Sequence, residues 1–306
     1  MRQLLSDVTV VELAEGVAGD YCGKVFADLG ADVVKLERPS GDRLREQAGA
    51  FAHLNLNKRS VVGDPAGEGQ AWVWRLLERA DLVVETTDCG CLRDWGTTWE
   101  EVHTRFPQLV VTSISGFGAS GPYASYEWTD LVAQSFSGVL VAVGAGQNPV
   151  RLPAHIELCT VGHTAAVGGL AAVMRSRATG AGTRVDCAAY EALGGGPHRI
   201  LNHLAYEYRG RVVPPLDANA TPAAGTGTLL PLGIFPCADG YVSMMTTLQN
   251  LPRMLDVLGD ASLREAFSRP EALVDPATKE ALDAVLYPWL LQRTRADVMA
   301  AAQDAG

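Results

Sequence analysis

Residues 8–43 constrain the fold more than any other stretch of the chain. An apolar, β-branched run at 8–13 predicts a strand, and the glycines that follow it end that strand. Apolar side chains at 22, 25, 26 and 29 then repeat with the spacing of one helix face, and a second apolar run at 33–36 predicts another strand. Two strands joined by one helix lie parallel with a right-handed crossover. The loops at 15–19 and 37–43 should therefore share the carboxyl edge of a sheet, where ligands bind.

The rest of the first two thirds of the chain alternates in the same way between strand and helix patterns. This alternation predicts an α/β fold with a parallel sheet covered on both faces. The predicted strands are 60–62, 82–85, 109–114 and 183–188, and the predicted helices are 65–80, 99–105, 130–143 and 158–176.

A change of composition divides the chain. Residues 210–227 are rich in Pro, Ala, Gly and Thr and are interpreted as a linker or active-site loop. Two apolar runs then flank Asp239-Gly240, which predicts a β-hairpin. We therefore expect a large domain over 1–209 and a small α+β domain over 228–306.

Composition and charge exclude several classes of function. The 306 residues are 47% apolar and carry a net charge of −10 without a basic tract, which argues against nucleic acid as a partner. The six cysteines have the spacing of neither a disulfide framework nor a zinc site, so no metal is expected. No signal peptide and no uncharged run of membrane-spanning length is found, so we expect a cytoplasmic protein without membrane contact.

Eight segments, in order along nearly the whole chain, resemble the family III CoA-transferases (the CaiB/BaiF group), which include formyl-CoA transferases and α-methylacyl-CoA racemases. The resemblance implies a Rossmann-like large domain, a smaller α+β domain and an interlocked dimer. The segments are VVELAEGVAG, DLGADVVKLERPSGD, NLNKRSV, ADLVVE, SISGFGASGPY, TDLVAQSFSGVL, GGLAAVMRSRATGAGTRVDCAAYEAL and FPCADGYVSM.

The same resemblance implies the substrates and the residues that bind them. Acyl-CoA and a carboxylic acid are the expected partners, with no permanently bound cofactor. Arginine and lysine side chains suit the phosphates of CoA, because they offer forked or point-like positive charge. The positions that match the family's CoA-binding residues are Gly16, Val17, Ala18, Arg38, Lys58 and Arg59.

The family's catalytic position is altered in this sequence. CoA-transferases of the family use one Asp as nucleophile, and a carboxylate suits the role because the acyl group passes between carboxylates of similar leaving ability. The matching window, 153–160, holds no Asp. Leu158 falls in the transferase register, whereas the racemase spacing puts Glu157 at the site. Glu157 is therefore our catalytic candidate.

Three interpretations of this window stay open. Glu157 is a working nucleophile or base, or it is only a carboxylate stabilised by the dipole of a helix N-terminus. Racemase chemistry is disfavoured, because the position of the racemase His holds Thr129. His155 and His163 lie near the window and are interpreted as structural residues.

Two functions from different classes follow. The first is a CoA-transferase subunit that moves CoA between carboxylic acids through Glu157. The second is a noncatalytic CoA-binding or scaffold subunit of a heteromer; Asp88, where the family has an arginine, and the absence of the family's C-terminal return segment favour it. Accordingly, a homodimer or a heteromer with a related subunit is expected. A nucleotide-dependent oxidoreductase is a weaker third reading, since the first turn lacks G-x-G-x-x-G.

Overall fold

The computed structural model describes residues 3–87, 92–142, 144–145, 148–153, 155–196, 204–210 and 230–305. The chain divides into two compact units, which are described separately. Unit 1 consists of Met1–Leu140 and Arg151–Leu204, and unit 2 of Val141–Val150 and Ala205–Gly306.

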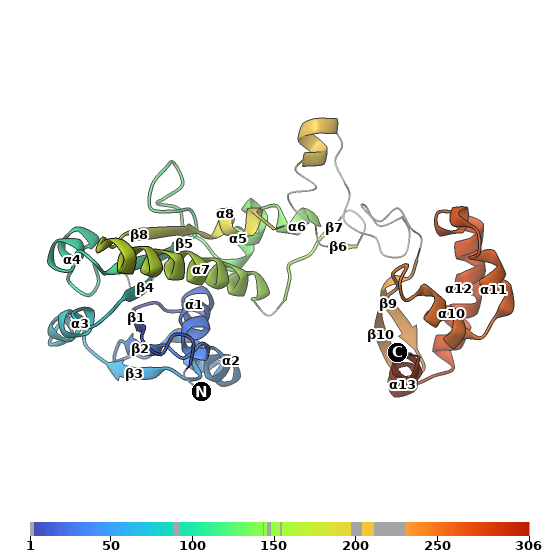
Figure 1. The fold of residues 1–306 in the computed structure, drawn as a ribbon, viewed down its shortest axis with the longest axis horizontal. Helices are drawn as coiled ribbons and strands as arrows, with labels where there is room; N and C mark the ends of the chain where they lie inside the picture. The colour runs from blue at the N-terminus through green and yellow to red at the C-terminus, as the bar shows by residue number, and fades with distance from the viewer. Residues whose placement is uncertain are drawn as a thin grey trace. The chain divides into compact units, whose positions relative to one another are not determined.

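Unit 1 is built on a parallel sheet, and the predicted α/β class with a Rossmann-like sheet is confirmed (Figure 1). The described residues form a six-stranded sheet in the order β3-β2-β1-β4-β5-β8. Val10 lies beside Val33 of β2 on one side and Leu82 of β4 on the other, so the predicted parallel pair is also confirmed. The strands are β1 (Thr9–Glu12), β2 (Asp32–Glu37), β3 (Arg59–Val62), β4 (Leu82–Thr86), β5 (Val110–Ser115) and β8 (Arg184–Ala188).

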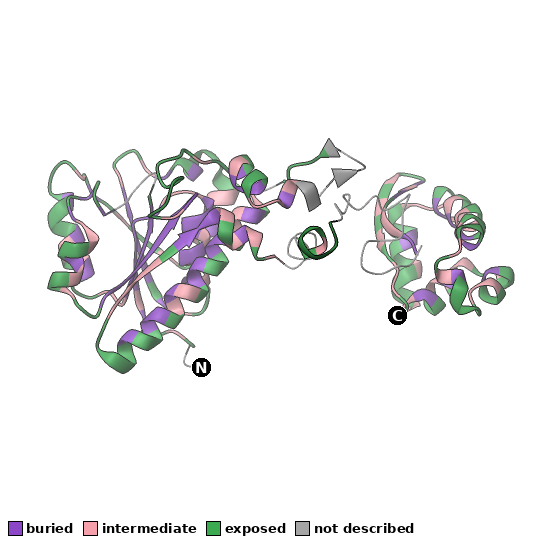
Figure 2. Cartoon of the chain, turned by 90° about the horizontal axis from the view of Figure 1, so that it is seen from above, coloured by how far each residue is buried: buried purple, intermediate pink, exposed green. Residues whose placement is uncertain are grey.

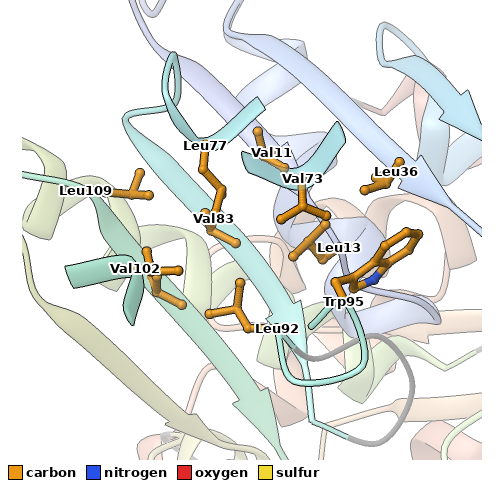
Figure 3. Packing of buried hydrophobic residues seen from close by; sticks show 11 residues of the cluster. Val11, Leu13, Leu36, Val73, Leu77, Val83, Leu92, Trp95, Val102 and Leu109 are labelled. Atoms are coloured by element: carbon orange, nitrogen blue, oxygen red, sulfur yellow. The ribbon is translucent and has the colours of Figure 1, made fainter. Parts of the chain in front are cut away.

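Helices cover both faces of this sheet, and the central strands β4 and β5 are fully buried, whereas most of the edge strand β3 is exposed (Figure 2). On one face, Val73 and Leu77 of α3 and Val102 of α4 pack with Val83 and Trp95 in one apolar cluster (Figure 3). The helices of unit 1 are α1 (Val17–Asp28), η1 (Arg43–Glu46), α2 (Ala48–Asn55), α3 (Gly69–Leu77), α4 (Trp99–Arg105), α5 (Asp130–Phe136), α7 (Ile156–Thr179) and α8 (Ala189–Gly194).

The long helix α7 lies on the other face and packs tightly against α1. A Cβ on Gly162 would come within 2.4 Å of the carbonyl oxygen of Ala18, and one on Gly169 within 2.8 Å of Thr112 Oγ1. Glycine at these two positions lets α7 approach both the helix and the sheet. By length and composition alone α7 could span a membrane, but a core helix of a soluble protein has the same properties.

Two predicted helices are shorter than expected, for local reasons. The helix predicted at 65–80 starts only at Gly69, because the amides of Gly67 and Gly69 both donate to the Asp64 carbonyl in a preceding turn. The helix predicted at 130–143 is split into α5 and α6 (Val139–Ala142) by Gly138, whose φ of +78° is left-handed. The hydrophobic pattern continues across this break, so the pattern alone does not reveal it.

Unit 2 contains the predicted hairpin and a group of helices. Strands β9 (Leu232–Cys237) and β10 (Gly240–Met245) pair antiparallel around the turn. Phe235, Leu286 and Leu290 form part of its apolar core, and a cavity of about 670 Å³ lies between β10, α10, α12 and α13. Other elements of this unit are β6 (Gly144–Ala145), β7 (Asn148–Pro149), α10 (Leu251–Leu258), α11 (Ala261–Ala266), η2 (Pro270–Leu273), α12 (Pro276–Leu291) and α13 (Arg295–Asp304).

Several expectations fall on residues outside the described ranges. These are Asp88 and, apart from Gly210, the linker predicted at 210–227. The division into units differs from the expected domains in two respects, since Val141–Val150 and residues 205–209 group with the second unit.

Candidate functional site

The carboxyl edge of the sheet in unit 1 gathers the loops that follow β1, β2 and β4. In the strand order, the chain runs outward from β1 to β3 and then returns to place β4 on the other side of β1. Such a reversal opens a crevice at the carboxyl ends of β1 and β4, which is where open α/β sheets bind ligands. The predicted loops at 15–19 and 37–43 both lie at this edge.

The loop after β1 leads directly into the N-terminus of α1. Gly16 precedes the helix with φ +83° and ψ 170°, a conformation that L side chains rarely adopt. Val17 and Ala18 are buried in the first turn. The first amides of a helix lack partners within the helix and favour an anion, so this turn suits a phosphate or carboxylate.

Arg38 connects three of the edge loops. Its Nη2 lies 2.9 Å from Asp94 Oδ2, and its Nε lies 3.4 Å from Glu15 Oε1. The Arg38 side chain keeps 32% of its surface exposed. Arg43 Nε is 4.0 Å from the other oxygen of Glu15. Burial and the charge of Asp42 raise the pKa of the Glu15 carboxyl, against the lowering effect of Arg38.

Lys35, a residue that the sequence analysis did not single out, is buried beneath the loops that follow β1 and β2 and contacts both of them. Its Nζ donates to Ala14 O at 2.9 Å and pairs with Glu12 at 3.0 Å, Asp20 at 2.6 Å and Asp42 at 2.8 Å. Burial alone would lower the pKa of this ammonium, but the three carboxylates raise it well above its usual value. Lys35 thus ties the loop after β1 to the loop after β2.

Lys58 belongs to the same internal cluster. Its Nζ lies 2.8 Å from Glu12 Oε2 and donates to Asp20 O at 2.7 Å and to Asn55 Oδ1 at 3.0 Å. Only 2% of its side chain is exposed. The predicted phosphate ligand is therefore enclosed by protein groups.

Arg59 lies at the opposite edge of the sheet. It is the first residue of β3 and pairs with Asp32, the first residue of β2. Because all strands run the same way, both residues mark the amino edge. The structure thus brings together Gly16, Val17, Ala18 and Arg38, but not Arg59.

Asp20 joins Lys35 to Asn55 within the cluster. Burial raises its pKa to about 7; Lys35 opposes this shift and Glu12 adds to it. Its oxygens accept from Lys35 at 2.6 Å and from Asn55 Nδ2 at 2.9 Å. The cluster combines two ammonium groups with three carboxylates, so a proton on one of them would balance its charge.

The start of α7 adjoins the loop at 16–18. Leu158, at the transferase register, is partly buried and packs against an apolar cluster that includes Val17 and Leu44. Glu157 lies in the first turn of α7 with only 6% of its surface exposed. A carboxylate at a helix N-terminus interacts favourably with the helix dipole.

Asp130 organises the chain immediately before Glu157. Gln134 Nε2 donates to Asp130 Oδ1 at 3.0 Å, and Gln134 Oε1 accepts from the amide of Leu152 at 3.0 Å. Asp130 Oδ2 faces His155 Nδ1 at 3.5 Å and Arg151 Nη1 at 3.9 Å. The sequence analysis named His155 but did not connect it with Asp130, since 25 positions separate them in the chain.

The residues missed from sequence share one recognisable signal. Glu12 ends β1 and Lys35 lies within β2, each directly after two valines, in a sheet expected to be buried on both faces. Such charges must pair with one another, because an unpaired buried charge is costly. The ranges that the structure describes contain no group of three or more metal-binding side chains.

Comparison with known protein families gives a consistent match. The family model described as CoA-transferase family III matches residues 5–306. A succinyl-CoA–D-citramalate CoA-transferase of Chloroflexus aurantiacus is 31% identical over 95% of this chain and 73% of its own length. Subunit BbsE of the succinyl-CoA:(R)-benzylsuccinate CoA-transferase of Thauera aromatica is 34% identical over 81% of this chain. That alignment spans 61% of BbsE.

Comparison with solved structures supports the same grouping. A CaiB/BaiF family protein from Brucella suis superposes with a TM-score of 0.82 and 28% identity. The match covers 98% of this chain and 81% of that protein.

Proposed function

Since this chain belongs to CoA-transferase family III, whose members transfer CoA between carboxylic acids, we propose that it performs this transfer through Glu157. The relatives named above are CoA-transferases, which supports the activity and does not favour a noncatalytic scaffold. The observation that carries the assignment of Glu157 is its position. It is a buried carboxylate in the first turn of α7, and the next residue packs against the loop at 16–18.

The CoA site that we propose is the carboxyl edge of unit 1. The amides at the start of α1 and the exposed part of Arg38 would contact the phosphates of CoA. Gly16, Val17 and Ala18 provide a close backbone approach, because Gly16 has no side chain and the other two side chains are buried. Arg43, 70% exposed, adds a second guanidinium at the same edge of the sheet, which we call the rim.

Lys58 and Arg59 receive different roles. We propose that Lys58 neutralises Glu12 and fixes α1, because its ammonium is already surrounded by acceptors. Arg59 pairs with Asp32 at the amino edge, too far along the strands to share the rim with Arg38. Neither residue is part of the proposed phosphate contact.

The proposed reaction balances without an added acid, base or cofactor. The Glu157 carboxylate attacks the thioester carbon of the donor, the C–S bond breaks, and CoA leaves as a thiolate beside a mixed anhydride. The thiolate then attacks the Glu157 carbonyl, which releases the donor acid and leaves CoA on Glu157 as a thioester. The acceptor carboxylate then attacks the Glu157 thioester and displaces the CoA thiolate, which gives a second mixed anhydride. The thiolate attacks the acceptor carbonyl of this anhydride, so that the new acyl-CoA leaves and the Glu157 carboxylate is restored.

Burial of Glu157 serves this sequence in two ways. A carboxylate that is largely removed from water is a better nucleophile, and the anhydride formed on it is protected from hydrolysis. The N-terminal turn of α7 offsets the cost of burying the charge.

The relatives indicate the kind of donor and assembly. Several of them are named for succinyl-CoA as donor, and we propose succinyl-CoA here together with a small dicarboxylic acid as acceptor. Relatives named as subunits support a heteromer with a related chain, and we propose either that assembly or a homodimer. We further propose a cytoplasmic enzyme that holds no cofactor permanently.

A transfer assay tests the proposal. The chain, alone or with its partner subunit, is incubated with succinyl-CoA and a panel of dicarboxylic acids, and new acyl-CoA esters are separated chromatographically. Wild type should form one or more esters, and Glu157→Gln should lower the rate by at least about 10³-fold, as loss of a nucleophile does. Glu265→Gln, which removes an equal charge from an exposed position on α11, is the matched control. Full activity of Glu157→Gln would refute the assigned role.

A further inference from the structure

The proposed anion contact of Arg38 is already occupied by carboxylates of the protein. Asp94 lies 2.9 Å and Glu15 3.4 Å from its guanidinium. With Arg43 included, two guanidinium groups face two carboxylates at this rim. A polyanion therefore meets a rim whose positive charge is largely compensated, even though it contains two arginines.

The ion pair between Arg38 and Asp94 also crosses the ligand crevice. Arg38 follows β2, whereas Asp94 lies in the turn beyond β4, and β1 lies between these two strands in the sheet. The crevice opens at the carboxyl ends of β1 and β4. The side chains of Arg38 and Asp94 thus bridge over the place where CoA is proposed to lie.

Asp94 is held firmly in this position. Its neighbour Trp95 is 1% exposed and fills the apolar cluster under the sheet edge, as does Leu92 (Figure 3). The amide of Leu92 donates to Glu85 Oε2 at 2.8 Å, and the amide of Trp95 donates to Leu92 O at 3.1 Å. These contacts hold the backbone of the turn in place and keep the partly exposed Asp94 carboxylate within reach of Arg38.

From this geometry we infer that Asp94 competes with the phosphates of CoA for Arg38 and thereby sets the affinity for acyl-CoA, an inference that rests on the proposed CoA site. Binding exchanges one partner of the guanidinium for another, so the affinity gained from Arg38 is reduced by the ion pair that is lost. Removing the charge of Asp94 should leave the guanidinium in place and free it for phosphate.

The experiment measures CoA affinity by calorimetry for wild type, Asp94→Asn, Arg38→Ala and the double variant. Asp94→Asn should bind CoA about threefold to fivefold more tightly, the upper part of the range expected for losing one partly exposed ion pair. In the Arg38→Ala background the same change should alter affinity by less than about twofold, because the two side chains act as a unit. The gain should shrink as salt is added.

A charge-matched control separates the contact from net charge. Glu100→Gln removes an equal charge from an exposed position on α4, six residues along the chain, and should leave CoA affinity unchanged. If Glu100→Gln tightens binding as much as Asp94→Asn, overall charge is responsible and the inference is overturned. Unchanged or weaker binding by Asp94→Asn overturns it as well.

A second readout does not depend on CoA binding. Phenylglyoxal modifies free guanidinium groups, and peptide mass spectrometry gives the modification rate at Arg38. The rate should rise several-fold in Asp94→Asn and stay unchanged in Glu100→Gln. If the modification rate at Arg38 rises in Asp94→Asn while neither protein binds CoA, the proposed function fails, but the ion pair between Arg38 and Asp94 is confirmed. If it does not rise, the inference fails whatever CoA does.

Discussion

Individual charged residues decide how this site is built. Glu12, Asp20 and Asp42 surround Lys35, and Lys58 closes the same cluster, so a small ionic core supports the rim from below. The sequence placed Lys58 in a phosphate site, because its position matches the family, but distance and burial place it in this core. A sequence pattern marks which residues are charged and does not show which way a long side chain turns.

The buried cluster predicts a pH dependence of stability that originates at Asp20. Its folded-state pKa of about 7 lies above the ordinary value of 3.8, so the folded protein holds the proton more tightly than the unfolded chain. This contribution to stability is complete below about pH 4 and is lost as the pH rises through 7. Between pH 5 and 8, wild type should lose on the order of 2 kcal/mol from this group.

Urea unfolding of wild type and Asp20→Asn at several pH values measures this effect. The Asn side chain resembles the protonated carboxyl, so the variant should lose less stability than wild type between pH 5 and 8. Parallel pH profiles for the two proteins would show that Asp20 is not the titrating group.

At the scale of elements, hydrophobic periodicity and turn residues were sufficient to predict most of unit 1. The parallel pair β1–β2, the helix α4 and the hairpin of unit 2 formed where the pattern indicated. The split between α5 and α6 did not follow from the pattern, because it depends on the left-handed backbone of Gly138. The pairing of Asp130 with His155 was equally hidden, since it arises from tertiary packing between α5 and the start of α7.

The loop before α1 predicts a backbone effect that can be isolated. At Gly16 a Cβ would meet no atom within 4 Å, yet the φ of +83° is strained for any other residue. Gly16→Ala should therefore cost about 1–3 kcal/mol of stability through the backbone alone. CoA affinity should fall too, because the first turn of α1 would shift.

Gly49→Ala is the matched control for this change. Gly49 lies in α2, its Cβ position is also open, and its φ is not left-handed. Alanine there should be neutral or stabilising by up to about 1 kcal/mol. Thermal unfolding and CoA titration of both variants give the comparison, and equal effects at the two glycines would rule out a special role for the loop.

At the scale of the whole molecule, the exposed face of α7 predicts association. Ile156, Val167 and Met174 are more than half exposed although they lie on the central helix of unit 1. Apolar side chains gathered on one face commonly mark a contact with another subunit. Light scattering should therefore give a mass of at least twice the 32.5 kDa of one chain, for a homodimer or with a related subunit. A fully active particle of 32.5 kDa would contradict this expectation.

Trapping CoA on the enzyme tests the central claim most directly. The protein is incubated with succinyl-CoA, digested, and the peptide that contains Glu157 is analysed by mass spectrometry. The account predicts a CoA thioester on that side chain, lost on adding an acceptor acid and absent from Glu157→Gln. A folded protein that binds CoA and transfers it, but carries no CoA on Glu157, would contradict it.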